Sequence, residues 1–112
     1  PPAEDAARLD LNDRGELLLQ SVDGFPALLD DPWLNARLTT LHACSDLWAC
    51  GARLHSLQVV LTLPEAAAAL QEELLLQTLA GVRSVSDPLE APLLGGHTLE
   101  GRDGAGLALV PQ

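Results

Sequence analysis

Apolar positions along this chain follow two different spacings, and the switches between them predict where its elements lie. Short apolar runs typical of β-strands occur at residues 7–11, 16–22, 56–63, 93–99 and 107–110. Two longer stretches, residues 31–51 and 64–81, have the length and composition of helices, and the second is rich in strong helix formers. The predicted order is strand, strand, helix, strand, helix, strand, strand.

This order predicts the α+β fold class, with one mixed β-sheet that carries two helices on one face. Turn residues at 12–15 and at Asp103-Gly104 predict that the first two strands form one hairpin and the last two another. The strands are too apolar for the second face of the sheet to meet water. We therefore expect a partner subunit or a second domain to cover that face.

The first predicted helix carries the clearest sequence signals. Asp31 and Pro32 are typical of a helix start, and Gly51 is typical of a stop. At about 100° per residue, one narrow polar stripe contains Asn35, Thr39, His42 and Asp46. The broad opposite side, which we expect to face the core, contains Leu34, Leu38, Leu41, Cys44 and Trp48. Taken alone, a polar stripe of this kind is most often a solvated face.

Composition limits the class of protein. The 112 residues suffice for a single domain, which we expect to span residues 1–112. A net charge of −10 with only six Lys and Arg argues against nucleic-acid binding, which needs basic side chains. No apolar run approaches the roughly 20 residues that span a bilayer, so no membrane association is expected. Because the chain begins with Pro1-Pro2 and not Met, we expect a fragment of a longer protein.

The two cysteines, Cys44 and Cys50, lie six positions apart in the predicted helix. That spacing separates them by about 9 Å along the helix axis, whereas a disulfide needs Cα atoms within about 7 Å. We therefore expect two reduced, buried or half-buried thiols, and a cytoplasmic protein.

Three carboxylates occupy positions that suit chemistry. Asp5 precedes the first strand, Asp23 follows the second, and Asp46 lies late in the first helix. Carboxylates of this kind can hold Mg²⁺ together with substrate phosphates, and the glycines at 95–96 would let backbone N–H groups approach a phosphate. The same residues have plainer explanations, because Asp-Gly is a turn signal and Gly-Gly in a strand is often a bulge. Both interpretations stay open at this point.

Six segments together resemble a known family. They are EDAA at 4–7, QSVD at 20–23, DDP at 30–32, HACSDLWACGA at 42–52, LTLP at 61–64 and LLGGHTLEG at 93–101. In the sequence and spacing of these motifs, the chain resembles the N-terminal, ATP-binding domain of selenophosphate synthetase (selenide, water dikinase), within the aminoimidazole ribonucleotide synthetase superfamily. The QSVD and HAxSD motifs are similar to those of family members that are fused to an NADH-dehydrogenase-like flavoprotein.

The resemblance implies a parent enzyme that converts selenide, ATP and water into selenophosphate, AMP and phosphate, with Mg²⁺ as cofactor. It implies metal binding by Asp5 and Asp46. The ATP-binding positions it implies are Asp23, Asp46, Gly96, His97 and Thr98. The last three correspond to a loop that reaches the nucleotide of the partner subunit. The resemblance therefore implies a homodimer through the sheet, in which we expect Val59 and Leu61 to point into the interface.

The chain also departs from this family. Trp48 and Cys50 stand where Tyr and Met are usual, and Leu41 or His42 stands where many members have Asn. The family's catalytic Cys or selenocysteine and its Lys correspond to a segment before residue 1, so no catalytic residue is expected here and the isolated fragment should be inactive. Two alternatives stay open. One is another ATP-dependent member, such as a thiamine-monophosphate kinase or a hydrogenase-maturation protein, and the other is a non-catalytic dimerisation module.

Overall fold

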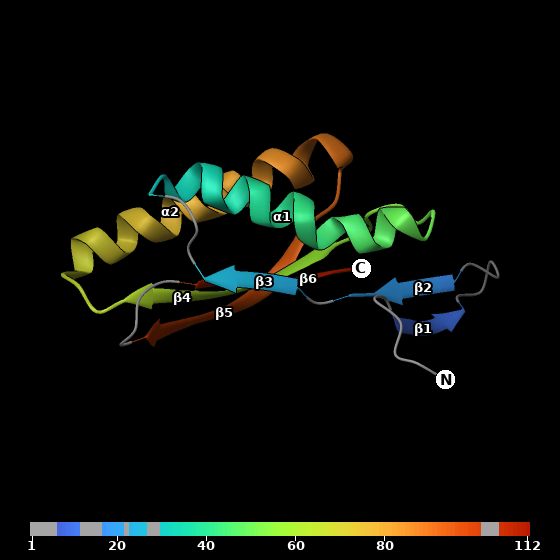
Figure 1. Cartoon of the computed structure of the whole chain (residues 1–112), viewed down its shortest axis with the longest axis horizontal. Helices are drawn as coiled ribbons and strands as arrows, with labels where there is room; N and C mark the ends of the chain where they lie inside the picture. The colour runs from blue at the N-terminus through green and yellow to red at the C-terminus, as the bar shows by residue number, and fades with distance from the viewer. Residues whose placement is uncertain (1–6, 12–16, 22, 27–29, 102–105) are drawn as a thin grey trace.

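A computed structural model describes residues 7–11, 17–21, 23–26, 30–101 and 106–112. Its elements, in chain order, are β1 (Ala7–Leu11), β2 (Leu17–Gln20), β3 (Asp23–Pro26), α1 (Pro32–Ala49), β4 (Leu57–Pro64), α2 (Ala68–Ser86), the 3₁₀-helix η1 (Asp87–Leu89), β5 (Leu93–Gly101) and β6 (Gly106–Pro111). Four of the strands form one mixed sheet in the order β3-β6-β4-β5, and β1 and β2 form a separate hairpin (Figure 1).

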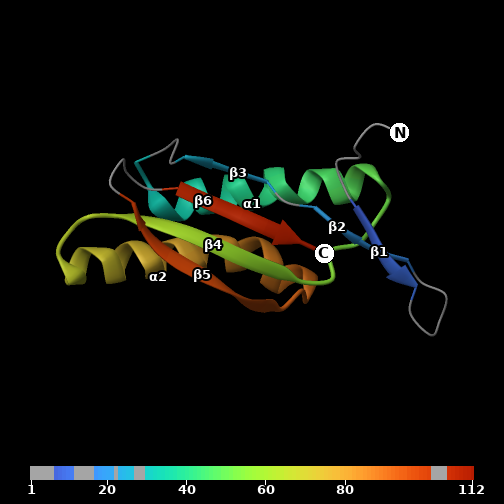
Figure 2. The ribbon, with the colours of Figure 1, turned by 90° about the horizontal axis from the view of Figure 1, so that it is seen from below.

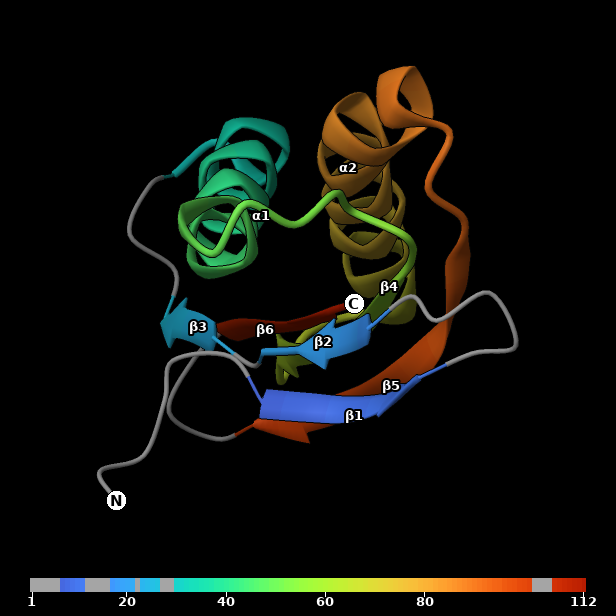
Figure 3. The ribbon, with the colours of Figure 1, turned by 90° about the vertical axis from the view of Figure 1, so that its right-hand side faces the viewer.

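Both helices lie on the same face of the four-stranded sheet. The view along the sheet shows α1 over β3 and β6 and α2 over β4 and β5 (Figure 3). The core between these layers is built from small and medium aliphatic side chains, among which Leu47, Leu57 and Leu109 are fully buried. The predicted α+β class, with two helices on one face of a mixed sheet, is confirmed.

The predicted hairpin of the last two strands is wrong, although the one at β1 and β2 is confirmed. β5 pairs in parallel with β4, and β6 pairs antiparallel with β4 on its other side. A parallel neighbour needs a long crossover, which α2 supplies between β4 and β5. The turn signal at Asp103-Gly104 lies outside the described residues, and β4 separates the strands that flank it.

A third strand, β3, was not expected, because Asp23-Gly24 and Pro26 are typical of a turn. In the structure these residues pair antiparallel with β6, with Asp23 opposite Leu109 and Pro26 opposite Gly106. β3 is an edge strand, and the edge of a sheet is where a strand tolerates Pro and Gly. The apolar run predicted as one strand at 16–22 therefore ends at Gln20, and the chain continues into the larger sheet.

The predicted core face of α1 is largely wrong. Leu34, Leu38 and Trp48 are 39%, 48% and 39% exposed, whereas Cys44 is buried as expected. The buried positions of this helix are Asn35, Ala36, Thr39, Thr40, Ala43, Cys44 and Leu47. Side-chain size explains this choice, because α1 packs closely against both the sheet and α2, and small residues allow that approach. The solvated-face explanation of the polar stripe therefore fails for Asn35 and Thr39.

The two helices approach each other closely at Gly81. A Cβ atom at this position would overlap the carbonyl oxygen of Trp33 and lie 2.7 Å from the Cβ of Ala36. Gly81 thus lies inside α2 as a contact point, and the prediction that it ends the helix is wrong. The helix begins at Ala68, four residues after the predicted start at Pro64, which instead ends β4.

The termini of α1 agree with the sequence signals. The Asp31 side chain accepts hydrogen bonds from the backbone N–H groups of Trp33 and Leu34, at 3.0 and 3.2 Å. Gly51, just beyond the helix, has φ +76°, a conformation that favours glycine. Within the described residues, no helix has the length and apolar character needed to cross a membrane.

The two cysteines are unlinked, as predicted, but their surroundings differ. Cys44 is buried and Cys50 is exposed, so the expectation that both are at least half-buried is wrong for Cys50. Burial raises the pKa of the Cys44 thiol to about 11, because a thiolate would lose its hydration there.

Candidate functional site

The carboxylates that the sequence singled out are only partly within the described structure. Asp5 lies outside it. Asp23 is the first residue of β3 and pairs with Leu109 of β6, which in turn pairs with Val59 of β4. The side chains of Leu109 and Val59 are buried against the helices. Position 23 therefore lies at the sheet edge that α1 covers.

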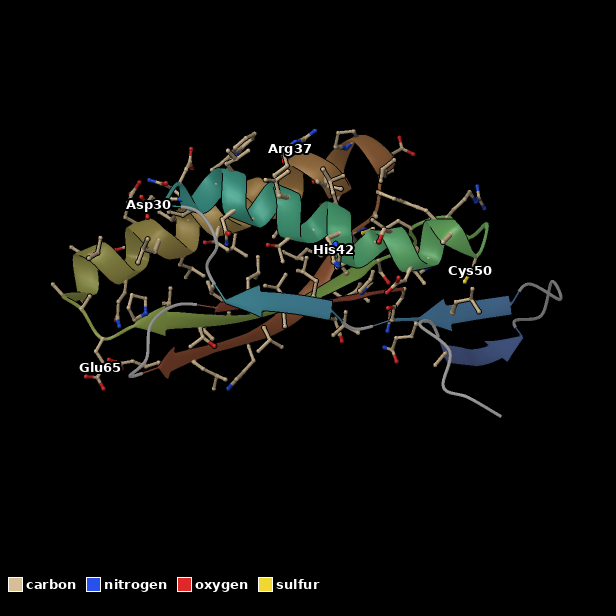
Figure 4. All side chains as sticks on the ribbon, in the orientation of Figure 1. Asp30, Arg37, His42, Cys50 and Glu65 are labelled. Atoms are coloured by element: carbon tan, nitrogen blue, oxygen red, sulfur yellow. The ribbon has the colours of Figure 1, made fainter. Side chains whose placement is uncertain are left out.

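Asp46 lies in the last turn of α1. It is half-buried, and His42, one turn before it, is exposed. Figure 4 shows His42 between α1 and the β3 end of the sheet. No hydrogen bond or ion pair joins the Asp46 carboxylate to another residue within the described ranges. A half-buried carboxylate without a protein partner is unusual, because burial removes hydration that a partner normally replaces.

The Gly95–Thr98 segment lies in β5, at the opposite edge of the sheet. The register shifts by one residue between the pairs Leu57–Leu93 and Gln58–Gly95, an irregularity of the kind that a bulge produces. Gly95 has φ +140°, and no atom lies within 4 Å of where its Cβ would be. Gly96 differs, because its Cβ would overlap the carbonyl oxygen of Val59 on β4. The fold thus gives each glycine a structural reason that needs no phosphate.

The two predicted halves of the site do not meet within one chain. Asp23, Leu109, Val59 and Gly96 form one row across the sheet, with Asp23 and Gly96 at its ends. Three strand spacings of about 4.8 Å place these ends about 14 Å apart. His97 pairs with Val60 in the next row of the sheet, and the His97 side chain is exposed. The structure therefore places Asp23 at one edge of the sheet and the Gly96–Thr98 segment at the other.

The expectation that Val59 and Leu61 point into an interface is wrong. Both are buried against the helices, at 4% and 5% exposed. Their neighbours Val60 and Thr62 alternate with them and are only partly buried, so they belong to the opposite, open face of the sheet. Figure 2 views the molecule from the side of this open face. The described β6 residues that share this face are Gly106, Ala108 and Val110. Small side chains thus lie at the centre of the open face, and larger ones are added by Gln58 of β4 and by His97 and Leu99 of β5, which pair with Val60 and Thr62.

Metal ligands can be assessed only for the described residues. Within the described ranges, no group of three or more His, Cys, Asp or Glu side chains is placed to hold a metal ion. Asp46 supplies the hard carboxylate oxygens that Mg²⁺ prefers, and Mg²⁺ usually takes only one or two carboxylates together with water and phosphate. The chemistry of this donor therefore fits a magnesium–nucleotide, with the remaining ligands supplied by water and phosphate oxygens.

Arg37 joins the two helices through its guanidinium group. Its Nη1 atom donates hydrogen bonds to the carbonyl oxygen and the hydroxyl of Ser84 on α2, at 3.2 and 3.0 Å. Arg37 thus ties the two helices together on their outer side. A shallow hollow of about 400 Å³ beside this contact is lined by Ala80, Arg83, Ser84, Asp87 and Pro88. It contains none of the predicted site residues.

Comparison with protein families gives one match across nearly the whole chain. Residues 3–110 match the family described as AIR synthase related protein, N-terminal domain. Selenide, water dikinase of Myxococcus xanthus is 36% identical over 86 residues, which are 76% of this chain and 23% of that protein. The protein of the same name from Paraburkholderia xenovorans is 30% identical over 98 residues, 88% of this chain and 27% of its own length. The chain thus spans about a quarter of the relatives that it matches.

Solved structures show the same fold. The protein tt0281 from Thermus thermophilus is 28% identical with a TM-score of 0.83, and the match covers 99% of this chain and 36% of that one. AaThiL complexed with AMPPCP and TMP is 18% identical with a TM-score of 0.79, over 96% of this chain and 35% of its own. Hydrogenase maturation protein HypE in complex with ATP is 22% identical with a TM-score of 0.69, over 96% and 32%.

Proposed function

The chain belongs to the AIR synthase related protein family, as its N-terminal domain, and from this membership we propose that it is the ATP-binding part of a selenide, water dikinase. The observation that carries the proposal is the position of Asp46. This carboxylate is half-buried without a protein partner within the described ranges, on the helix that covers the β3 edge where Asp23 lies. A nucleotide with its divalent cation would supply what Asp46 lacks.

In the parent enzyme, selenide, ATP and water would yield selenophosphate, AMP and phosphate. Mg²⁺ held there would neutralise phosphate charge and polarise the phosphoryl oxygens. Asp46 and Asp5 would bind the cation, and Asp23 and Asp46 would orient the nucleotide. The 1–112 segment carries no catalytic residue on this proposal, and a fragment of this length should bind nucleotide without turnover. The fused flavoprotein and the cytoplasmic location stay predictions.

The placement of the second half of the site supports a homodimer. Gly96, His97 and Thr98 lie at the opposite sheet edge from Asp23, so we propose that they act on the nucleotide held by the partner chain. The open face, with Val60, Thr62 and the small residues of β6, is the surface through which two sheets would meet. Replacing Val60 by Asp should then give a monomer and weaken nucleotide binding together, as measured by light scattering and calorimetry.

The first test is titration of the chain with ATP and Mg²⁺. Asp46→Asn should weaken binding by at least tenfold, or about 1.4 kcal/mol, since a charge-assisted contact is worth about that much or more. The matched control is Glu72→Gln, which removes one charge from an exposed position on α2. Unchanged affinity in Asp46→Asn, or no binding by the folded wild-type chain at millimolar ATP, would contradict the proposal. The latter would favour a non-catalytic dimerisation module.

A complementation experiment tests the shared site. Asp46→Asn and His97→Ala each damage both sites of their own homodimer. Mixed dimers of the two variants would contain one site with both defects and one with neither. After subunit exchange at equal amounts, about a quarter of the wild-type sites should therefore reappear. A mixture that binds no more ATP than the separate variants would contradict action in trans.

A further inference from the structure

One side of α1 carries an apolar stripe that remains at the surface. Leu34, Leu38, Leu41, Ser45 and Trp48 follow one another at spacings of four, three, four and three residues, so they share one side of the helix. Leu34, Leu38 and Trp48 are exposed, and Leu41 is half-buried. Side chains at this spacing normally pack against a second helix. The stripe therefore has the pattern of a contact surface without a contact.

Arg37 lies at the edge of this stripe, next to α2. Leu34 and Leu41 are one turn before it and one turn after it, and Figure 4 shows Arg37 on the side of α1 that faces away from the sheet. Its Nη1 atom donates to the carbonyl oxygen and the hydroxyl of Ser84. This carbonyl lacks the usual helical donor, because Pro88, four positions later, has no backbone N–H. One nitrogen of Arg37 thus serves the end of α2.

The contact with Ser84 leaves the positive charge of Arg37 without a carboxylate. Among the residues that the structure describes, the hydrogen bonds of Arg37 go to Ser84, and no acidic side chain pairs with it. The side chain is half-buried, so water solvates it only in part. Such a guanidinium is unusual in a chain of net charge −10. Its remaining N–H groups can bind a carboxylate that comes from outside the described residues.

We propose that this surface, formed by Leu34, Arg37, Leu38, Leu41 and the hollow beside Ser84, binds an amphipathic helix of a separate protein. The helix would place apolar side chains on the leucines and one Asp or Glu opposite Arg37. An arginine surrounded by apolar side chains is typical of the centre of a protein interface. The surface requires no nucleotide, so the inference does not rest on the proposed function.

A second copy of this chain fits the surface less well. It would present the same stripe, which contains no carboxylate. Asp87 lines the hollow, but its carboxylate already forms an ion pair with Arg83, with 3.3 Å between the Arg83 Nε atom and the carboxylate oxygen. Charge complementarity therefore favours a partner that brings its own carboxylate.

Selection from a phage-displayed library of helical peptides tests the proposal with a defined probe. Peptides selected on the wild-type chain should share a carboxylate flanked by apolar residues at three- and four-residue spacing. They should bind Arg37→Gln and Leu38→Ser at least about tenfold more weakly, because both changes remove a central contact. The matched controls Arg53→Gln and Leu70→Ser change exposed residues elsewhere and should bind as the wild type does. A library without binders, or binders that tolerate both surface variants, would overturn the proposal.

A double-mutant cycle isolates the charge pair. Replacing the carboxylate of a selected peptide by its amide should weaken binding to the wild-type chain about tenfold and leave binding to Arg37→Gln nearly unchanged. Equal losses with both chains would contradict the pairing with Arg37. Because Arg37 also holds the end of α2, circular dichroism checks that the variant is folded. Should Arg37→Gln not fold, the amide peptide and Leu38→Ser leave Arg37 in place and still decide the test.

Other occupants of the surface would give different results. Loss of self-association in Leu38→Ser, measured by light scattering, would assign the surface to a second copy of the chain. Selected sequences that recur in the parent protein outside residues 1–112 would assign it to an internal contact. Either result would overturn the inference of a separate partner. The affinity for MgATP should be equal in Leu38→Ser and the wild type, so the inference and the proposed function can fail independently.

Discussion

Replacing Gly96 by Ala tests whether this glycine is needed by the fold before any ligand is bound. The added Cβ would overlap the carbonyl oxygen of Val59 and lie 2.8 and 2.9 Å from its carbonyl carbon and nitrogen. These are backbone atoms of the adjacent strand and cannot rotate away, as the end of a side chain could. β5 would therefore have to move away from β4 at the centre of their parallel pairing.

The cost follows from two contributions. Forcing extra volume into a closely packed position costs about 1–3 kcal/mol, and each interstrand hydrogen bond that the shift weakens costs about 0.5–1.5 kcal/mol. We expect a total loss of about 2–4 kcal/mol, a large share of the 5–15 kcal/mol typical of a domain. With a urea slope of about 1–3 kcal/mol per molar, the unfolding midpoint should fall by about 1 M or more.

Urea unfolding of three variants separates the causes. Gly95→Ala adds a side chain where no atom lies within 4 Å but φ is +140°, so backbone strain alone should cost about 1–3 kcal/mol. Thr98→Ala, at an exposed position of the same strand, should stay within about 0.5 kcal/mol of the wild type. A Gly96→Ala variant as stable as Thr98→Ala would refute the close approach of β5 to β4. The purpose of Gly96 would then lie in ligand binding.

Four further predictions follow from packing and burial. Gly81→Ala should lower the free energy of unfolding by about 1–2 kcal/mol in a thermal melt, because overlap with the Trp33 backbone exceeds the gain of about 1 kcal/mol in helix propensity. Leu47→Ala empties a fully buried position and should cost about 2–5 kcal/mol in chemical denaturation. Cys50 should react at once with a thiol reagent and Cys44 only on unfolding. The free energy of unfolding should fall as the pH rises from about 9 towards 11. In this range the Cys44 thiol ionises in the unfolded chain, whereas its pKa of about 11 keeps it neutral in the folded chain. Denaturant unfolding compared at pH 8 and pH 10 measures this loss of stability.

Local signals in the sequence predicted most elements, because they act over a few residues. The Asp31 cap, the Gly51 stop and the β1–β2 hairpin are of this kind, and all three are present. The pairing of distant strands is different. The turn signal before β6 could not show that β6 pairs with β3 and β4. The pairing of β6 depends on how the chain crosses over through α2.

The faces of α1 could not be derived from hydrophobicity alone. The helix contacts two neighbours at once, and the positions nearest to them hold Ala, Thr and Cys because larger side chains would not fit. Leu34 and Leu38 are more apolar but are left at the surface. Hydrophobic periodicity identifies a buried side where large residues fill the contact. Here close packing selects small ones, and only the structure reveals the distance between the elements.

Gly96 and Asp46 were both singled out by the same family resemblance, yet the fold explains only one of them. Gly96 has a steric reason to be glycine that holds without any ligand. Asp46 has none, since its carboxylate is half-buried and bonds to no other residue within the described ranges. A residue that costs stability without a compensating contact is typical of a functional site. Asp46→Asn should therefore leave stability unchanged or raise it, and a site for a cation and nucleotide is the simplest reason for the carboxylate to be there.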